Sequence, residues 1–187
     1  MMDAIKKKNR SNISENLSEL LFCVILILLS CKQVTPPPDT TQKVKDSTNI
    51  ALVKNTFKAL ENENLEALEG FYSDSIGVVG PAFNNWYGKE QLIKNLASWF
   101  ESADSIKFSI FYIMAETIEE GDLAGDWILL WADGSFYDMA AQKKIKFSYH
   151  AGEKIQDGKI VIEANYWDEW DIYMQMGAEL KWPEKKK

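Results

Sequence analysis

Residues 145–171 read "IKFSYHAGEKIQDGKIVIEANYWDEWD", two strand-like runs on either side of Asp157-Gly158. An Asp-Gly pair readily adopts the positive φ angles of a two-residue turn, so the stretch predicts the closing hairpin of an antiparallel sheet. The first run carries His150, the only histidine of the chain. The hairpin raises a functional question: His150 is either half of a catalytic pair with an acid such as Asp168, or a sheet residue without chemistry.

Further strands are predicted around this hairpin. Between residues 106 and 114 apolar side chains recur at every second position, which is the period of a strand with one buried face. A turn is predicted at 120–122, and "AGDWILLWAD" at 124–133 is apolar on both faces, as a central strand is. The run at 159–173 is expected to close the sheet.

Three helices are predicted ahead of the long strands. Ser47 or Thr48 can cap the first, whose apolar residues between 50 and 60 recur at helical spacing. The second is short, at about 65–72, and the third begins near Gly88. Helices followed by long antiparallel strands indicate an α+β fold. A curved sheet wrapped over such helices encloses a cavity, which is a natural place for a ligand.

The start of the chain predicts that the protein is targeted to the bacterial cell envelope. A basic segment precedes an apolar run at 20–29, which is too short to span a bilayer as a helix but suits the core of a signal peptide. The run ends in Leu28-Leu29-Ser30-Cys31, which looks like a lipobox, the site where a cysteine is diacylated. An ordinary signal peptide that is cut nearby, or a short membrane anchor, is the alternative.

With this targeting signal, the chain is predicted to have four parts. Residues 1–30 are expected to be a lipoprotein signal peptide, and residues 31–47 a lipidated cysteine with a Pro-rich tether. Residues 48–180 have the size of one domain, and 181–187 are a basic tail. We expect the protein to be anchored by lipid on the periplasmic or surface face, for example at the outer membrane.

Charge and cysteine content exclude several classes of function. The formal net charge is −7, and it becomes −8 without residues 1–30, which carry four basic and three acidic residues. An acidic chain argues against nucleic acid as a partner, and against membrane contact other than through the lipid. The two cysteines, Cys23 and Cys31, both precede the domain, so one histidine and no thiol predict neither a metal site nor a cofactor.

Three phrases carry a family resemblance: "VKNTFKALENENLEALEGFYSDSIGVVG" at 53–80, "YGKEQLIKNLASWF" at 87–100 and "QDGKIVIEANYWD" at 156–168. In this order and spacing they resemble the NTF2-like superfamily, and within it the SnoaL-like domains, over nearly all of residues 48–177. The resemblance implies an α+β roll, a cone in which three N-terminal helices pack on a curved, mostly antiparallel sheet. It also implies a homodimer through the sheet.

The resemblance does not imply one activity. Members of this superfamily include polyketide cyclases, ketosteroid isomerases, dehydratases and epoxide hydrolases, whereas others only bind ligands or proteins, so the site must decide. Where cyclase-like members have an acid on the closing strand, this chain has Asn165, which cannot take a proton at neutral pH. The hydrolase pattern needs two acids and an arginine, and the only arginine here is Arg10, in the leader.

Candidate site residues follow from the strands. His150 and Asp168 are the candidate catalytic residues, because an imidazole and a carboxylate in an aromatic pocket can both move protons near neutral pH. Each also has a structural alternative: a histidine on the outer sheet face or in a dimer contact, and an acid that binds nearby backbone. Residues expected to line the pocket are Tyr72, Trp86, Tyr112, Trp131, Asp133, Asn165 and Tyr166, although a turn role for Asp133 is an alternative.

Three functions remain open. In the first, which we favour, a membrane-anchored lipoprotein binds a small apolar ligand or a partner in the roll cavity and is not an enzyme. In the second, the domain is a proton-transfer isomerase, cyclase or dehydratase that uses His150 or Asp168, with Tyr72 or Tyr112 as oxyanion donor. In the third, the domain is a structural dimer module whose cavity is filled by side chains such as Trp127 and Trp131.

Overall fold

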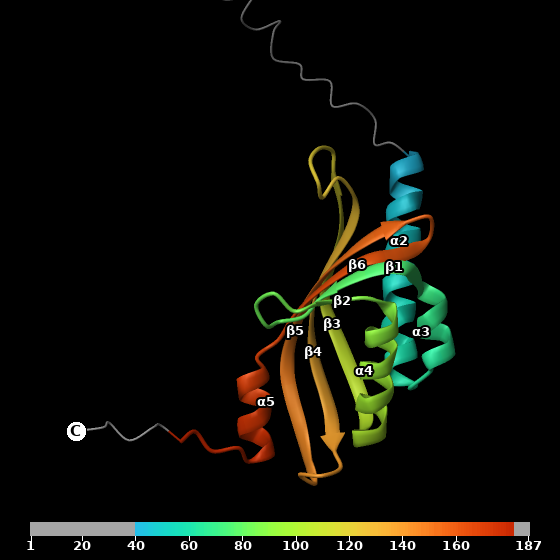
Figure 1. Cartoon of the computed structure of the whole chain (residues 1–187). Helices are drawn as coiled ribbons and strands as arrows, with labels where there is room; N and C mark the ends of the chain where they lie inside the picture. Colours follow the sequence, from blue (N-terminus) through green and yellow to red (C-terminus); the bar gives the residue numbers. More distant parts are fainter. Residues whose placement is uncertain (1–39, 182–187) are drawn as a thin grey trace, which may run out of the picture. The chain divides into compact units, whose positions relative to one another are not determined.

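A single six-stranded sheet organises residues 40–181, the part of the chain that the computed structural model describes (Figure 1). The strand order is β2-β1-β6-β5-β4-β3, and every neighbouring pair is antiparallel except β1 with β6. The strands are β1 (Tyr72–Val79), β2 (Trp86–Tyr87), β3 (Ala103–Ile118), β4 (Gly125–Asp138), β5 (Lys143–Gln156) and β6 (Lys159–Tyr166). The predicted tight turn is confirmed, since Asp157 and Gly158 both have positive φ angles, of 51° and 71°.

The helices are α2 (Thr40–Glu61), α3 (Leu65–Phe71), α4 (Lys89–Ser102) and α5 (Glu169–Met176). The first three cover one face of the sheet (Figure 1), which confirms the predicted α+β architecture. The first helix begins at Thr40, eight residues before Thr48 and inside the segment predicted as tether. No helix within residues 40–181 is long and apolar enough to cross a membrane.

The predicted last strand at 159–173 is wrong in its second half. Strand β6 ends at Tyr166, and α5 follows at once because the Asp168 carboxylate accepts a hydrogen bond from the Asp171 amide at 3.0 Å and caps the helix. Gln175 of α5 pairs with both backbone groups of Lys146, at 3.0 and 2.7 Å. Strand β6 pairs with β5 only from His150 onward, so the part of β5 before His150 is an edge on that side. Gln175 of α5 supplies hydrogen-bond partners to the backbone of this edge at Lys146.

One sheet face, called here the inner face, packs against α2, α3 and α4. Leu68 and Leu130 are fully buried there, and Phe57 of α2 meets Phe108 of β3 edge to face, with 4.9 Å between ring centroids. Burying one such side chain stabilises the fold by about 1.5–3 kcal/mol. The opposite sheet face, called here the outer face, has no helix packed across it (Figure 1).

A bulge in β6 decides which residues reach the inner face. Ile155 of β5 is paired with Ile160, but Lys154 is paired with Ile162, so Val161 is an extra residue without a partner. An extra residue exchanges the two faces of a strand beyond it. Glu163 therefore points inward like Ile160, although the two positions differ in parity, and Tyr166 points outward.

Candidate functional site

A cavity of about 550 Å³ opens between the inner face and α4, and we call it the cone cavity. Its size lies within the range of small-molecule sites. Most of its wall is aromatic or aliphatic, and two carboxylates are the only charged side chains in it. The apolar and aromatic lining residues are Leu60, Tyr72, Gly80, Pro81, Tyr87, Leu92, Leu96, Trp99, Phe108, Phe136, Phe147, Tyr149, Trp167 and Ile172, and the polar ones are Asn85, Gln91, Asn95, Glu163, Asn165 and Glu169.

The polar end of the cone cavity is a chain of hydrogen bonds that ends at a buried carboxyl. The Tyr149 hydroxyl donates to Oδ1 of Asn165 at 2.5 Å, and Nδ2 of Asn165 donates to Oε1 of Glu163 at 2.6 Å. Tyr72 lies against the same carboxyl and acts on its pKa as a hydrogen-bond donor. All four residues line the cone cavity, and Glu163 and Asn165 are only 6% and 5% exposed. The site thus places a carboxyl, an amide and two phenols within an apolar wall.

A second buried carboxyl adjoins the first. Glu153 is 1% exposed and is the direct cross-strand partner of Glu163. Burial raises the pKa of Glu153 well above its ordinary value, and the charge of Glu163 raises it further. Burial also raises the pKa of Glu163, while the hydrogen bonds from Asn165 and Tyr72 work in the opposite direction. Burial thus raises the pKa of both carboxyls, and of the two only Glu163 has hydrogen bonds that counteract this shift.

The two phenols of the site stay protonated. Burial, followed by the charges of Glu163 and Glu153, raises the pKa of both Tyr72 and Tyr149 well above that of a free tyrosine. A phenol that cannot ionise is a permanent hydrogen-bond donor. Both hydroxyls are thus available to the carboxyl, the amide or a bound molecule.

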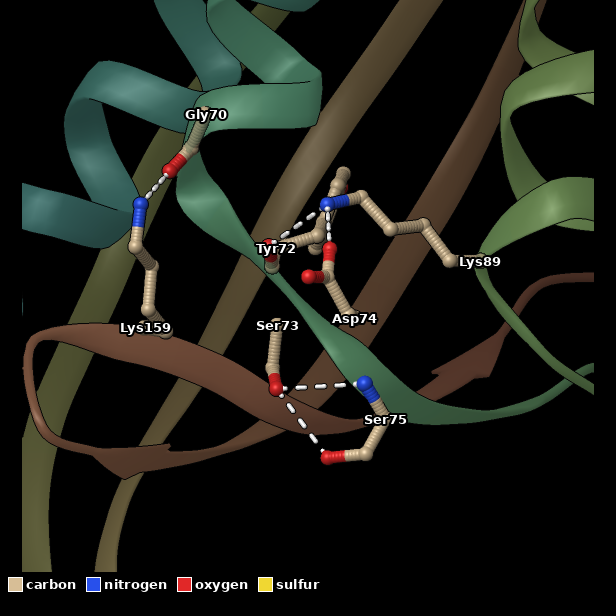
Figure 2. A network of polar contacts seen from close by, with 7 residues as sticks. All are labelled: Gly70, Tyr72, Ser73, Asp74, Ser75, Lys89 and Lys159. Carbon is tan, nitrogen blue, oxygen red and sulfur yellow. Dashed lines mark hydrogen bonds and ion pairs between the residues drawn. The ribbon is translucent and has the colours of Figure 1, made fainter.

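The backbone that presents Tyr72 is held from both sides (Figure 2). Nζ of Lys89, the first residue of α4, donates to the Tyr72 carbonyl at 3.2 Å and pairs with the Asp74 carboxylate at 2.7 Å. Nζ of Lys159, at the start of β6, donates to the Gly70 carbonyl at the end of α3. The junction of α3 and β1 is therefore tied to both elements that flank it, which fixes Tyr72 relative to Glu163.

The structure divides the predicted pocket residues. Tyr72 and Asn165 line the cone cavity. Trp86 and Tyr112 are 63% and 54% exposed and do not line it. Asp133 is exposed at a separate surface depression.

The candidate catalytic pair lies elsewhere. His150, Asp168, Trp131 and Tyr166 line an open hollow on the outer face. The His150 ring stacks on Trp131 with 4.4 Å between centroids, and its Nδ1 donates to the Leu130 carbonyl at 2.7 Å. Asp168 caps α5, as described above. The sequence does bring the two residues to one place, but that place is outside the cone cavity.

The sequence reasoning missed Glu163, Glu153 and Tyr149. Alternation along β5 puts Tyr149 on the face opposite His150, and in the structure that face is the inner one. Glu163 was overlooked because strict alternation from Ile160 puts it outside. A signal did exist: two glutamates in otherwise apolar strands flank the Asp157-Gly158 turn, and one bulge suffices to align them.

No group of three or more histidine, cysteine, aspartate or glutamate side chains within residues 40–181 is arranged to hold a metal ion. No protein-family model and no curated protein matches the chain.

Solved structures do resemble it. A putative SnoaL-like polyketide cyclase from Jannaschia sp. CCS1 matches with a TM-score of 0.59 at 14% identity, over 72% of this chain and 95% of that one. A protein with a ketosteroid isomerase-like fold from Catenulispora acidiphila, solved in complex with trimethylamine, matches at 0.57 and 17% over 71% and 96%. An LEH-like epoxide hydrolase from M. tuberculosis matches at 0.57 and 16% over 71% and 91%. At these identities the likeness shows the fold alone, and that fold is the NTF2-like α+β cone of SnoaL-like and ketosteroid isomerase-like proteins.

Proposed function

We propose that the cone cavity binds a small, mostly apolar ligand whose one polar group meets Tyr72, Asn165 and Glu163. The observation that carries this proposal is a cavity of about 550 Å³ with aromatic walls and a single hydrogen-bonded end. Apolar walls supply affinity, and a few placed polar groups set orientation, which is the usual composition of a small-molecule site.

The position of two tryptophans also supports a ligand over a filled structural module. Trp127 and Trp131 alternate with the inward-facing Ile128 and Leu130, so both belong to the outer face. The Trp127 indole N–H donates to the Leu123 carbonyl at 2.8 Å, and Trp131 stacks on His150. Neither side chain lines the cone cavity.

A neutral fluorescent probe tests this proposal. N-phenyl-1-naphthylamine brightens in apolar surroundings, and we expect the full chain to bind it saturably. Leu96→Trp adds bulk to the cavity wall and should weaken binding at least tenfold, or about 1.4 kcal/mol. The matched change Leu129→Trp, on the outer face, should leave binding unchanged. Equal binding by both variants, or no binding by the unmodified chain, would contradict the proposal.

Proton-transfer catalysis at the same site is a second candidate, favoured by the surroundings of Glu163. A carboxyl in an apolar pocket can exchange a proton with a carbon acid, and an adjacent phenol such as Tyr72 can stabilise the oxyanion that forms. The predicted base, His150 or Asp168, gives way in this version to Glu163. Conversion of a β,γ-unsaturated ketone to its conjugated isomer is the assay. Glu163→Gln should abolish turnover and Glu116→Gln, on the outer face, should not.

We also propose that Cys31 carries the lipid anchor and that the protein lies in the bacterial cell envelope. Cys31 and the signal-like run at 20–29 lie outside the described residues, and the proposal rests on the sequence pattern. Incorporation of labelled palmitate in the native chain, and its loss in Cys31→Ser, is the expected result. Equal labelling of both chains would contradict it.

The outer face is the proposed contact with a second copy of the chain. Phe111, Tyr112 and Tyr166 are 66%, 54% and 51% exposed there, close to the stacked Trp131 and His150. A contiguous apolar patch on a sheet face is typical of an interface. Sedimentation should find a dimer that Tyr112→Lys dissociates, and a monomer at every concentration would contradict it.

A further inference from the structure

We propose that the ligand of the cone cavity carries a positively charged nitrogen, as an amine or ammonium group attached to an apolar body. This inference rests on the proposed binding function and names the chemical class of its ligand. Three features of the cavity point to it: the charges of its wall, the direction of its hydrogen bonds and its aromatic faces.

The wall of the cone cavity carries two carboxyl groups and no cationic side chain. Its charged lining residues are Glu163, which is buried, and Glu169, which is exposed, and no lysine, arginine or histidine lines it. The ion pairs within residues 40–181 join other residues: Lys45 with Asp126, Lys89 with Asp74 and Lys107 with Glu61. A buried carboxylate is costly unless it is paired, and a ligand cation would supply the partner that an ionised Glu163 does not have among these residues.

The hydrogen bonds at Glu163 run toward it. Tyr149 donates to Oδ1 of Asn165, which leaves the Asn165 amide group to donate to Oε1 of Glu163 at 2.6 Å. Oε2 of Glu163 and Oε2 of Glu153 have no hydrogen-bond partner at all. The protein therefore supplies donors to the Glu163 carboxyl and leaves part of the carboxyl's accepting capacity unused.

Aromatic walls complete a site for a cation. Tyr149 and Trp167 stack with 6.1 Å between centroids, and Phe108 packs edge to face against Tyr149 at 5.7 Å. The faces of such rings attract cations by about 0.5–2 kcal/mol. These walls thus suit both the charge and the apolar body of an organic ammonium ion.

The charge acts even without direct contact. The two unpaired oxygens are themselves enclosed, but an attraction between charges inside a protein is several times stronger than in water at the same separation. A cation bound near Glu163 also favours the ionised form of that carboxyl, which burial alone disfavours. A neutral ligand of the same shape provides neither effect.

Two matched compounds test the inference on the full chain. 2-Phenylethylamine is a cation at neutral pH, and 2-phenylethanol has the same body with a hydroxyl in place of the ammonium group. Both are measured by displacement of N-phenyl-1-naphthylamine. We expect the amine to displace the probe at a concentration at least tenfold lower than the alcohol. We also expect Glu163→Gln to remove that difference and Glu116→Gln to keep it.

Each other outcome is decisive. If the alcohol competes as well as the amine, or if neither compound displaces a bound probe, the cavity has no preference for a cation and the inference fails, while the proposed binding function stands. If the probe itself does not bind, the binding function fails and takes the inference with it. The comparison of amine with alcohol on the unmodified chain remains valid should Glu163→Gln not fold.

Discussion

The two faces of this sheet use similar residues for different purposes. Tyr149 and His150 are neighbours in β5, yet Tyr149 lines the cone cavity and donates to Asn165, whereas His150 stacks between Trp131 and Tyr166 on the outer face. On the inner face burial makes each polar group depend on its partners, because no water replaces a lost bond. On the outer face the polar groups lie nearer to solvent, where water can replace a lost hydrogen bond. Residue type therefore tells less than the face on which a residue lies.

The largest expected effect compares two adjacent leucines in β4, one on each face of the sheet. Leu130 is fully buried on the inner face, whereas Leu129 is half-buried on the outer face. We expect Leu130→Ala to lower the free energy of unfolding by about 2–5 kcal/mol, because it leaves a cavity in the core. Leu129→Ala should cost about 1 kcal/mol or less, as its side chain buries less surface. Urea unfolding curves give both values, and equal losses would break the distinction between the faces.

Alternation of residues predicted much of this from the sequence. The α+β class, three leading helices, the Asp157-Gly158 turn and the opposite facing of Tyr149 and His150 all follow from local patterns. Two features of the structure could not be predicted from local patterns. The bulge at Val161 is a choice of pairing between strands, and no residue in "GKIVIEAN" marks it. Residues 169–173 were predicted as strand because aromatic side chains favour strands, but the Asp168 cap starts the helix α5 there.

The site was harder to predict than the fold for the same reason. Asn165 and Tyr72 were recognised as pocket residues, whereas Glu163 was hidden by the bulge. Asn165 stands where an acid is expected, but two residues earlier, on the same face, Glu163 supplies one. Burial then raises the pKa of Glu163. Burial depends on tertiary packing, which the alternation of residues does not reveal.

The buried glutamates provide the next test, which concerns pH. Burial raises the pKa of Glu153 in the folded chain above its value in the unfolded chain. Below about pH 4 both states are protonated and this contribution to stability is complete. As the pH rises, the unfolded chain ionises first, so stability is lost until the pH passes the folded pKa. We expect Glu153→Gln, which cannot ionise, to be more stable than the native chain at pH 8 and similar to it at pH 4.

The size of this effect follows from the shift itself, at about 1.4 kcal/mol for each unit by which the pKa is raised. Chemical denaturation at pH 4, 6 and 8 measures it. Glu116→Gln makes the same change on the outer face, where the side chain is exposed, and should follow the native pH profile. A Glu153→Gln variant that loses stability at pH 8 would show that the carboxylate is compensated within the protein.

The smallest expected change in the free energy of unfolding comes from removing one of two tyrosine hydroxyls, one on each face of the sheet. Tyr149→Phe removes the donor to Oδ1 of Asn165 and leaves a buried acceptor without a partner, which should cost about 1–3 kcal/mol. Tyr166→Phe removes a hydroxyl from a side chain that is half exposed on the outer face, and its effect should stay within about 0.5 kcal/mol. Midpoints of urea unfolding distinguish the two. If Tyr149→Phe is as mild as Tyr166→Phe, water must reach Asn165, and the polar end of the cone cavity is then open to solvent and a weaker site for a charged ligand.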